Sequence, residues 1–196
     1  MNYQEVRKNR STATRRDILE AASKLIRELG FEKMTIRDVC AEAGVTTGAF
    51  YHHFSSKDEL ISQGFSSLDD HLEKAMTGKM ELPPAQRLEA LAQAYAWYVE
   101  ELGWQTMSLY YQRRLTAPSS VVISPDRFTL RTMEACFQEL SQQGELSPGY
   151  TPTQLSDLCF RLFRGEVIDW ILHEGGYPLL PKMIQDFNML DTAFRP

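Results

Sequence analysis

Two short amphipathic segments joined by a glycine-containing turn constrain the fold of this chain more than any other feature. Thr35 is a favourable N-cap, and Asp38 three residues later approximates a capping box. Apolar residues then recur at helical spacing, and Gly44 can adopt the positive φ that ends a helix. The sequence therefore predicts a short helix over residues 36–43.

A second short helix is predicted directly after this turn. Val45 is expected to be the buried pivot, and Thr46 or Thr47 to cap a helix that reaches Phe54. Apolar residues spaced by one and four give this helix one apolar side. Two short helices joined by a three- or four-residue turn with a glycine form a helix-turn-helix.

The side chains outside that apolar side carry donors and no acid. They are small, hydroxylated, aromatic or imidazole residues: Thr46, Thr47, Gly48, Tyr51, His52 and His53. A surface that meets phosphates and base edges needs donors and must avoid carboxylates. The pattern indicates a DNA-binding face, and the alternative is an ordinary three-helix packing unit with a solvated face.

A third helix is predicted after the helix-turn-helix. Ser56 and Glu59 match a full capping box, and Lys57 lies in the first turn, where a cation and backbone N–H groups together suit a phosphate. Apolar spacing continues the helix to Gly78, about 20 residues or roughly 30 Å at the usual rise. Gly64 weakens one turn of it and serves either a bend or close packing.

The segment GVTTGAFYHHFSSKDEL, residues 44–60, resembles the signature of the TetR family of bacterial transcriptional repressors. That signature is Gly-Val-Ser-x-Gly-x-x-Tyr-x-His-Phe-x-x-Lys-x-x-Leu, and the resemblance covers roughly residues 12 to 65. It implies a ligand-responsive regulator, most often a repressor, that binds a palindromic operator as a homodimer. By position it implies phosphate contacts from Thr35, Thr46, Tyr51, His53 and Lys57, and base contacts from Thr47, Gly48 and either Arg37 or His52.

Charge is distributed unevenly along the chain. Residues 1–57 hold ten Lys and Arg against seven Asp and Glu, a net +3, while the remainder holds eleven against nineteen, a net −8. This asymmetry confines the expected DNA contact to the N-terminal end. Residues 1–11 are basic without apolar periodicity, which predicts a mobile arm for the DNA backbone or minor groove, or equally a solubilising tail.

The rest of the chain shows helical patterns and no period-2 strand pattern. Helices are predicted from Thr12 or Thr14 to Gly30, then over about 84–102, 104–115, 124–144, 152–174 and 178–192. Phe31 is expected to fill the gap between the first helix and the helix-turn-helix. The predicted fold is all-α, with a basic arm and three-helix DNA-binding domain in residues 1–56 and a larger helical effector-binding and dimerisation domain in residues 57–196.

The helix over residues 152–174 has apolar residues on more than one side. Such a helix must bury one side in its own core and the other against a partner. In the resembled family the last two helices pair with their copies across a two-fold axis, and a wholly internal core is the alternative. The predicted dimerisation residues are Leu155, Leu158, Leu162, Gly165, Ile168, Leu172, Ile184 and Phe187.

Aromatic and methionine residues crowd the middle of the chain. Small-molecule sites are mostly apolar, so by analogy with the family this region predicts a cavity for a small apolar or aromatic effector. Aromatic residues at helical spacing also form ordinary cores, which is the alternative. The candidate ligand-binding residues are Trp97, Trp104, Met107, Tyr110, Tyr111, Phe128, Phe137, Phe163 and Trp170.

Motifs for catalysis and cofactors are missing from the sequence. There is no P-loop, GxSxG, HExxH or Gly-rich dinucleotide turn, so no enzyme activity and no cofactor are predicted. His52 and His53 do not predict a metal site, because adjacent helical residues point about 100° apart and no further ligand lies at suitable spacing. The competing functions are a DNA-bound regulator controlled by a protein partner and an enzyme that uses the aromatic cavity.

Cysteines and hydropathy bear on the cellular compartment. Cys40, Cys136 and Cys159 form no CxxC pair and are predicted to be small buried thiols, with a redox-sensor role for Cys40 as the alternative. No apolar run reaches 18 residues and no signal peptide is visible, so a cytoplasmic protein without membrane contact is expected.

Overall fold

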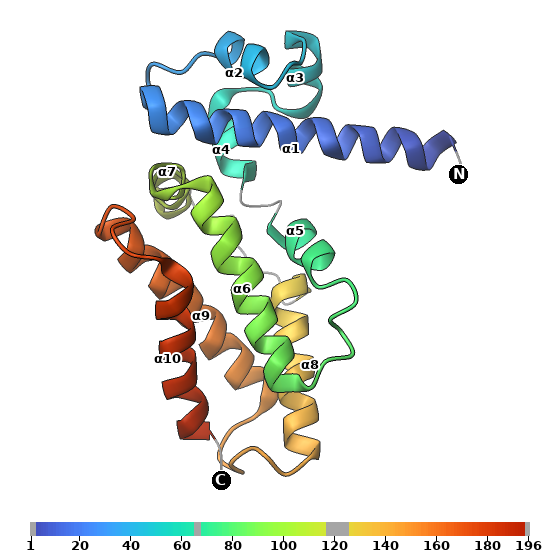
Figure 1. Ribbon diagram of the computed structural model, residues 1–196, viewed down its shortest axis with the longest axis vertical. Helices are drawn as coiled ribbons and strands as arrows, with labels where there is room; N and C mark the ends of the chain where they lie inside the picture. The colour runs from blue at the N-terminus through green and yellow to red at the C-terminus, as the bar shows by residue number, and fades with distance from the viewer. Residues whose placement is uncertain (1–2, 65–67, 117–125, 195–196) are drawn as a thin grey trace. The chain divides into compact units, whose positions relative to one another are not determined.

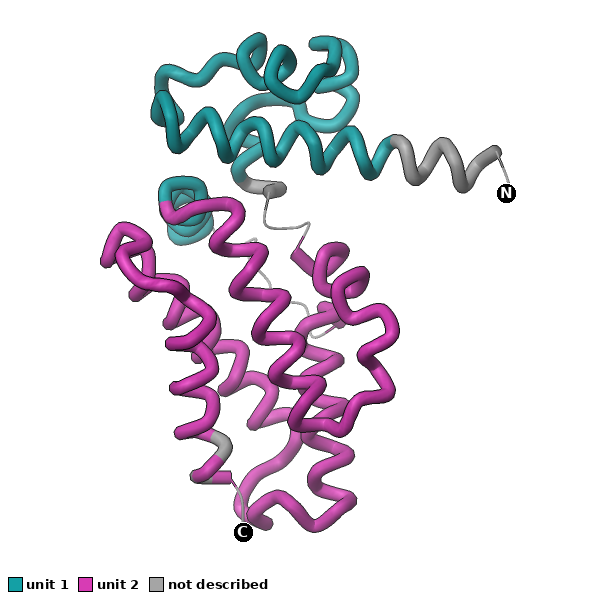
Figure 2. Tube along the Cα trace, viewed as in Figure 1, with its two compact units in different colours: residues 1–66, 105–116 teal, residues 67–104, 117–196 magenta. Residues whose placement is uncertain are grey.

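The computed structural model describes residues 3–64, 68–116 and 126–194, and all regular elements in these ranges are α-helices (Figure 1). This confirms the all-α prediction. The chain forms two compact units, unit 1 with residues 1–66 and 105–116 and unit 2 with residues 67–104 and 117–196 (Figure 2). The predicted division after residue 56 differs from this, because the start of the third helix and residues 105–116 belong to unit 1.

The described residues of unit 1 form five helices. They are α1 (Tyr3–Leu29), α2 (Ile36–Glu42), α3 (Thr47–His53), α4 (Lys57–Gly64) and α7 (Trp104–Thr116), of which unit 1 contains residues 105–116. Helix α1 packs against α2 and α3, and α2 packs against α3. Their buried side chains, with those of α4, form one core that includes Ile18, Ile26, Phe31, Met34, Val39, Phe50, Phe54 and Leu60.

The N-terminal segment differs from its prediction. Residues 3–11, expected to be a mobile arm, are the first turns of α1. Neither Gly nor Pro occurs between Tyr3 and Leu29, and extending an existing helix costs little compared with starting one. Gly30, at φ 80°, ends α1 as predicted, and the following Phe31 is 8% exposed within the core.

The single long helix expected to follow Lys57 is described as two helices. Helix α4 ends at Gly64, α5 (Leu68–Ala75) begins in unit 2, and residues 65–67 lie outside the described residues.

Unit 2 is a bundle of α5 with α6 (Pro84–Leu102), α8 (Phe128–Gln142), α9 (Pro152–Leu172) and α10 (Leu179–Phe194). Helix α9 packs on α8 and α10, α6 packs on α8 and α10, and α5 covers α6 and α8 (Figure 1). The predicted bounds of α6 are confirmed, with Pro84 at its first position and Gly103, at φ 79°, as its C-cap. The Ser124–Pro125 start predicted for α8 lies outside the described residues, and Arg127 is its N-cap.

None of the described helices is long and apolar enough to cross a membrane.

Candidate nucleic-acid interface

Helix α2 is fixed by the cap that the sequence predicts. The Thr35 hydroxyl oxygen accepts from the Asp38 backbone N–H at 3.2 Å, and the Asp38 carboxylate accepts from the Thr35 N–H at 2.9 Å. Hydrogen bonds from the Thr35 hydroxyl and backbone lower the pKa of Asp38. Gly44 adopts φ 64° at the turn, as predicted, but Val45 is only partly buried and is not the fully buried pivot that was expected.

Helix α3 is anchored by two aromatic rings on its inner side. Phe50 and Phe54 are 0% and 1% exposed, and their ring centroids lie 5.8 Å apart. Thr46 is the N-cap, because its hydroxyl accepts from the Ala49 N–H at 3.1 Å. These contacts hold α3 in one orientation about its own axis, which determines the side chains that face outward.

The outer side of α3 has the composition that the sequence predicts for a DNA-binding face. Thr46, Thr47, Gly48, Tyr51 and His52 are exposed, and the Tyr51 ring is 57% exposed although it is large and aromatic. Thr35 and Arg37 on α2 are exposed as well. The structure therefore brings these predicted residues together on two helices that pack against each other.

Gly48 is not required by the fold. Its φ is not positive, and a Cβ added there would meet only the Thr46 hydroxyl oxygen, at 3.8 Å. Alanine stabilises a helix relative to glycine, so the folded chain by itself favours alanine at this position. Glycine here fits a surface that something else approaches closely.

His53 is half-buried beside other cationic groups. Burial, the neighbouring His52 and Arg15 lower the pKa of His53, in that order of importance. The two imidazole rings lie 5.1 Å apart at 73°. Within the described ranges, no three histidine, cysteine, aspartate or glutamate side chains gather as metal ligands would.

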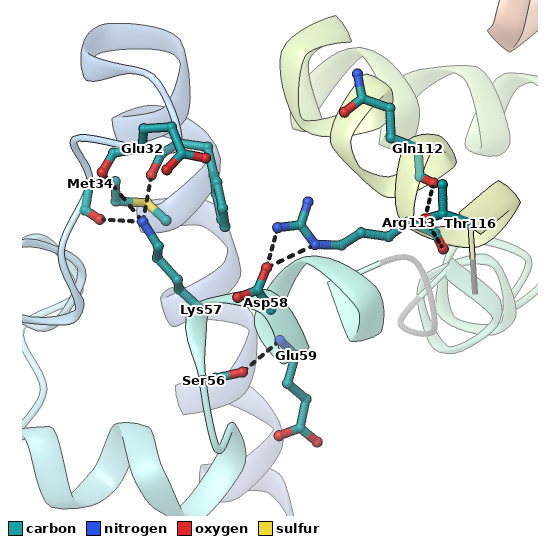
Figure 3. Close-up of polar contacts among 10 residues, drawn as sticks. Glu32, Met34, Ser56, Lys57, Asp58, Glu59, Gln112, Arg113 and Thr116 are labelled. Atoms are coloured by element: carbon teal, nitrogen blue, oxygen red, sulfur yellow. Dashed lines mark hydrogen bonds and ion pairs between the residues drawn. The ribbon is translucent and has the colours of Figure 1, made fainter. Parts of the chain in front are cut away.

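The start of α4 differs from its predicted geometry. The Ser56 hydroxyl accepts from the Glu59 N–H at 3.0 Å, as a cap should (Figure 3). The Glu59 carboxylate, however, accepts from the Ser55 N–H at 2.7 Å and from the Ser55 hydroxyl, one residue before the predicted partner.

Lys57 points its ammonium into unit 1. The nitrogen lies 3.0 Å from the carbonyl oxygen of Phe31 and 3.4 Å from those of Glu32 and Met34 (Figure 3). A contact between Lys57 and a phosphate remains a prediction. The three contacts with carbonyl oxygens favour another role for this side chain. Sequence reasoning also missed the ion pair between Arg113 and Asp58, which lie 55 residues apart, because no local pattern links the two residues.

The candidate ligand-binding residues are divided between the two units. Met107, Tyr110 and Tyr111 belong to unit 1, where Tyr110 packs against the core, and the others belong to unit 2. Phe137 and Phe163 are 1% exposed core residues, whereas Trp97 is 54% exposed and stacks on His71 with ring centroids 5.1 Å apart. The remaining candidates of unit 2 are Trp104, Phe128 and Trp170.

Helix α9 has the two apolar sides that the sequence predicts. Leu155, Cys159, Phe160, Phe163, Val167 and Trp170 are buried within unit 2. Ile168 and Leu172 are 41% and 76% exposed, and Leu158 and Leu162 are half-buried. On α10, Phe187 is buried, Ile184 is half-buried and Met189 is 67% exposed. One apolar side of α9 therefore remains uncovered within the described chain.

The cysteines are buried, as predicted. Cys40 is 4% exposed, and burial raises the pKa of its thiol. The thiolate is the form that reacts with oxidants, so this environment disfavours a redox-sensor role.

Comparison with known proteins agrees with the helix-turn-helix. Residues 18–63 match the family described as bacterial regulatory proteins, tetR family. The probable acrEF/envCD operon repressor of Escherichia coli (strain K12) is 25% identical over 175 residues, 85% of this chain and 80% of that protein.

Two solved structures share the fold of both units. TylP, a TetR regulator from Streptomyces fradiae, is 23% identical with a TM-score of 0.61, covering 95% of this chain and 89% of that one. Thermus thermophilus FadR in complex with lauroyl-CoA is 18% identical with a TM-score of 0.58, covering 90% and 92%.

Proposed function

Because the chain belongs to the TetR family of bacterial transcriptional regulators, we propose that it is a ligand-responsive repressor that binds a palindromic operator as a homodimer. The observation that carries this proposal is the exposed, acid-free side of α3 in a capped helix-turn-helix. A repressor of this kind acts on the genome and therefore in the cytoplasm. The relatives named above are transcriptional regulators, and no catalytic role is proposed.

In this role α3 lies in the major groove. Thr47 and Gly48, with Arg37 or His52, face base edges, and a threonine methyl can contact a thymine methyl. Thr46, Tyr51 and His53 bind phosphates, together with Thr35, whose hydroxyl is already engaged with Asp38. Two protomers related by a two-fold axis present two identical α3 helices, which requires a palindromic site.

The homodimer is proposed to form through α9 and α10. The exposed Ile168 and Leu172 provide the apolar surface that a partner copy would cover. Gly165 is exposed with no atom within 4 Å of an added Cβ, which leaves room for the backbone of a partner helix.

The effector is proposed to bind in unit 2. FadR, which has the same fold, was solved with lauroyl-CoA, so this fold accommodates a ligand. Any effector that lowers operator affinity must itself bind more weakly when operator is present, by the same factor. Coupling of about 1–3 kcal/mol corresponds to roughly 5–150-fold.

We expect an effector to change operator affinity by roughly 5–150-fold. The operator is selected from a random DNA library with the purified chain, and apolar and aromatic compounds are screened by thermal shift. Operator DNA is then titrated with and without each binder. Compounds that bind without changing operator affinity would favour the alternative, a DNA-bound regulator controlled by a protein partner.

Operator affinity is expected to rise as pH falls from about 7.5 to 6. In the free chain the pKa of His53 lies below the ordinary 6.5, so its ring is neutral at pH 7. A nearby phosphate favours the charged ring and raises that pKa, so DNA binding takes up protons. The rise is at most about tenfold per pH unit for each His53. His53→Gln should flatten it in titrations across this range. His173→Gln, which removes an exposed imidazole of unit 2, is the matched control and should leave the rise unchanged. An unaltered rise in His53→Gln would exclude the phosphate contact.

A further inference from the structure

Phe31 contacts two cations from different helices of unit 1. The Lys57 ammonium of α4 lies 4.4 Å from the ring centroid, and the Arg113 guanidinium carbon of α7 lies 4.6 Å from it. The attraction of a cation to an aromatic face strengthens when the site is shielded from water, and Phe31 is 8% exposed. The ring therefore joins α4 and α7 to the loop that follows α1.

The three donors of the Lys57 ammonium have partners within the chain. A lysine ammonium carries three N–H donors, and three carbonyl oxygens, those of Phe31, Glu32 and Met34, lie within 3.4 Å of this one (Figure 3). A phosphate contact from Lys57 would require some of these hydrogen bonds to break. The loop that they hold leads directly to Thr35, the N-cap of α2.

Arg113 connects α7 to α4. Its Nε donates to Asp58 Oδ1 at 3.1 Å, and its Nη2 donates to the same oxygen (Figure 3). The Asp58 side chain is 64% exposed, and an exposed ion pair stabilises a fold only slightly by itself. Leu109 and Tyr110 of α7 also pack on the core of unit 1, so α7 is attached to it by apolar and polar contacts together.

We propose that Lys57 and Arg113 are positioning residues for operator binding. Together they hold loop residues 31–34 and α4 in place, and the loop sets the position of α2 and of α3 packed against it. Lys57 then binds no phosphate, in contrast to the role implied for it by the family resemblance. This assignment rests on the operator binding proposed above.

The salt dependence of binding separates the two roles of Lys57. A lysine that neutralises a phosphate releases a counterion, so removing it lowers the slope of log affinity against log salt by about 0.9. Two copies in a dimer make the expected change about 1.8. We expect Lys57→Met to lower affinity for the selected operator at least about tenfold, through misplacement of α2 and α3, with the slope unchanged. A slope reduced by about 1.8 would overturn the positioning role.

Lys33→Met is the matched control for loss of charge. Lys33 is exposed in the same loop, so its replacement removes one positive charge without touching the contacts of Lys57. Its affinity for the operator is expected to stay within about threefold of that of the unmodified chain.

Charge reversal tests the role of Arg113. Asp58→Arg and Arg113→Asp each place like charges together, and the double variant restores an opposite pair. The quantity compared is operator affinity divided by affinity for random DNA, because this ratio cancels the general effect of added charge. Each single variant should lower the ratio at least about tenfold and the double variant should recover most of it. A double variant no better than the single ones would overturn the assignment.

Failure of operator binding and failure of the positioning role are distinguishable. If the unmodified chain selects no DNA sequence, operator binding is wrong. The positioning role is then decided by hydrogen exchange of the loop and α2 amides. Exchange should accelerate in Lys57→Met and not in Lys33→Met, and equal exchange in both would overturn the role.

Discussion

Replacing Ile168 with Glu is expected to separate the proposed homodimer and to lower operator affinity at least about 100-fold. Ile168 is 41% exposed on the side of α9 that the described chain leaves uncovered, so the new carboxylate is solvated in the monomer. In the dimer the same carboxylate would be buried without a partner, which is strongly unfavourable. A protomer that binds one half-site alone loses the avidity of two linked contacts, about 10²–10⁴-fold.

Sedimentation velocity and operator titration together check this prediction. Gln138→Glu, which adds the same charge at an exposed position of α8, is the control and should remain dimeric. Thermal unfolding shows whether each variant folds. If folded Ile168→Glu still sediments as a dimer, α9 does not form the interface.

Gly48→Ala is expected to stabilise the free protein while weakening operator binding. The added methyl group meets only the Thr46 hydroxyl oxygen at 3.8 Å, and alanine is favoured over glycine in a helix by about 0.5–1 kcal/mol. On the operator, the same methyl group occupies the space where α3 approaches the groove. A misfit of about 1–3 kcal/mol in each half-site lowers the affinity of a dimer by at least about 30-fold.

Gly48→Ala is expected to raise stability and to lower operator affinity, so the two effects can be told apart. Unfolding midpoint and operator affinity are measured on the same preparation, so a loss of binding cannot result from loss of fold. Gly149→Ala is the matched control, because Gly149 is an exposed glycine of unit 2 with no atom within 4 Å of an added Cβ. Full operator affinity in Gly48→Ala would show that α3 does not approach the groove at this residue.

Local chemistry explains which features could be predicted from the sequence. The caps at Thr35 and Thr46, the left-handed glycines at 30 and 44, and the apolar spacing of α6 and α9 each depend on residues within a few positions of one another. Their physical causes, hydrogen bonds to free helix ends and burial of one helix side, operate within a segment. The all-α fold and the outer side of α3 follow from them, so the sequence by itself determined the DNA-binding candidate.

Contacts between distant segments decided the rest. The direction of the Lys57 ammonium depends on where the carbonyls of the α1–α2 loop lie, and the partner of Arg113 is 55 residues away at Asp58. Aromatic residues look alike in sequence whether they fill a core, as Phe163 does, or lie exposed, as Trp97 does. Only tertiary packing separates these cases, because burial and ion pairing depend on the three-dimensional neighbours of a side chain, which helical periodicity does not specify.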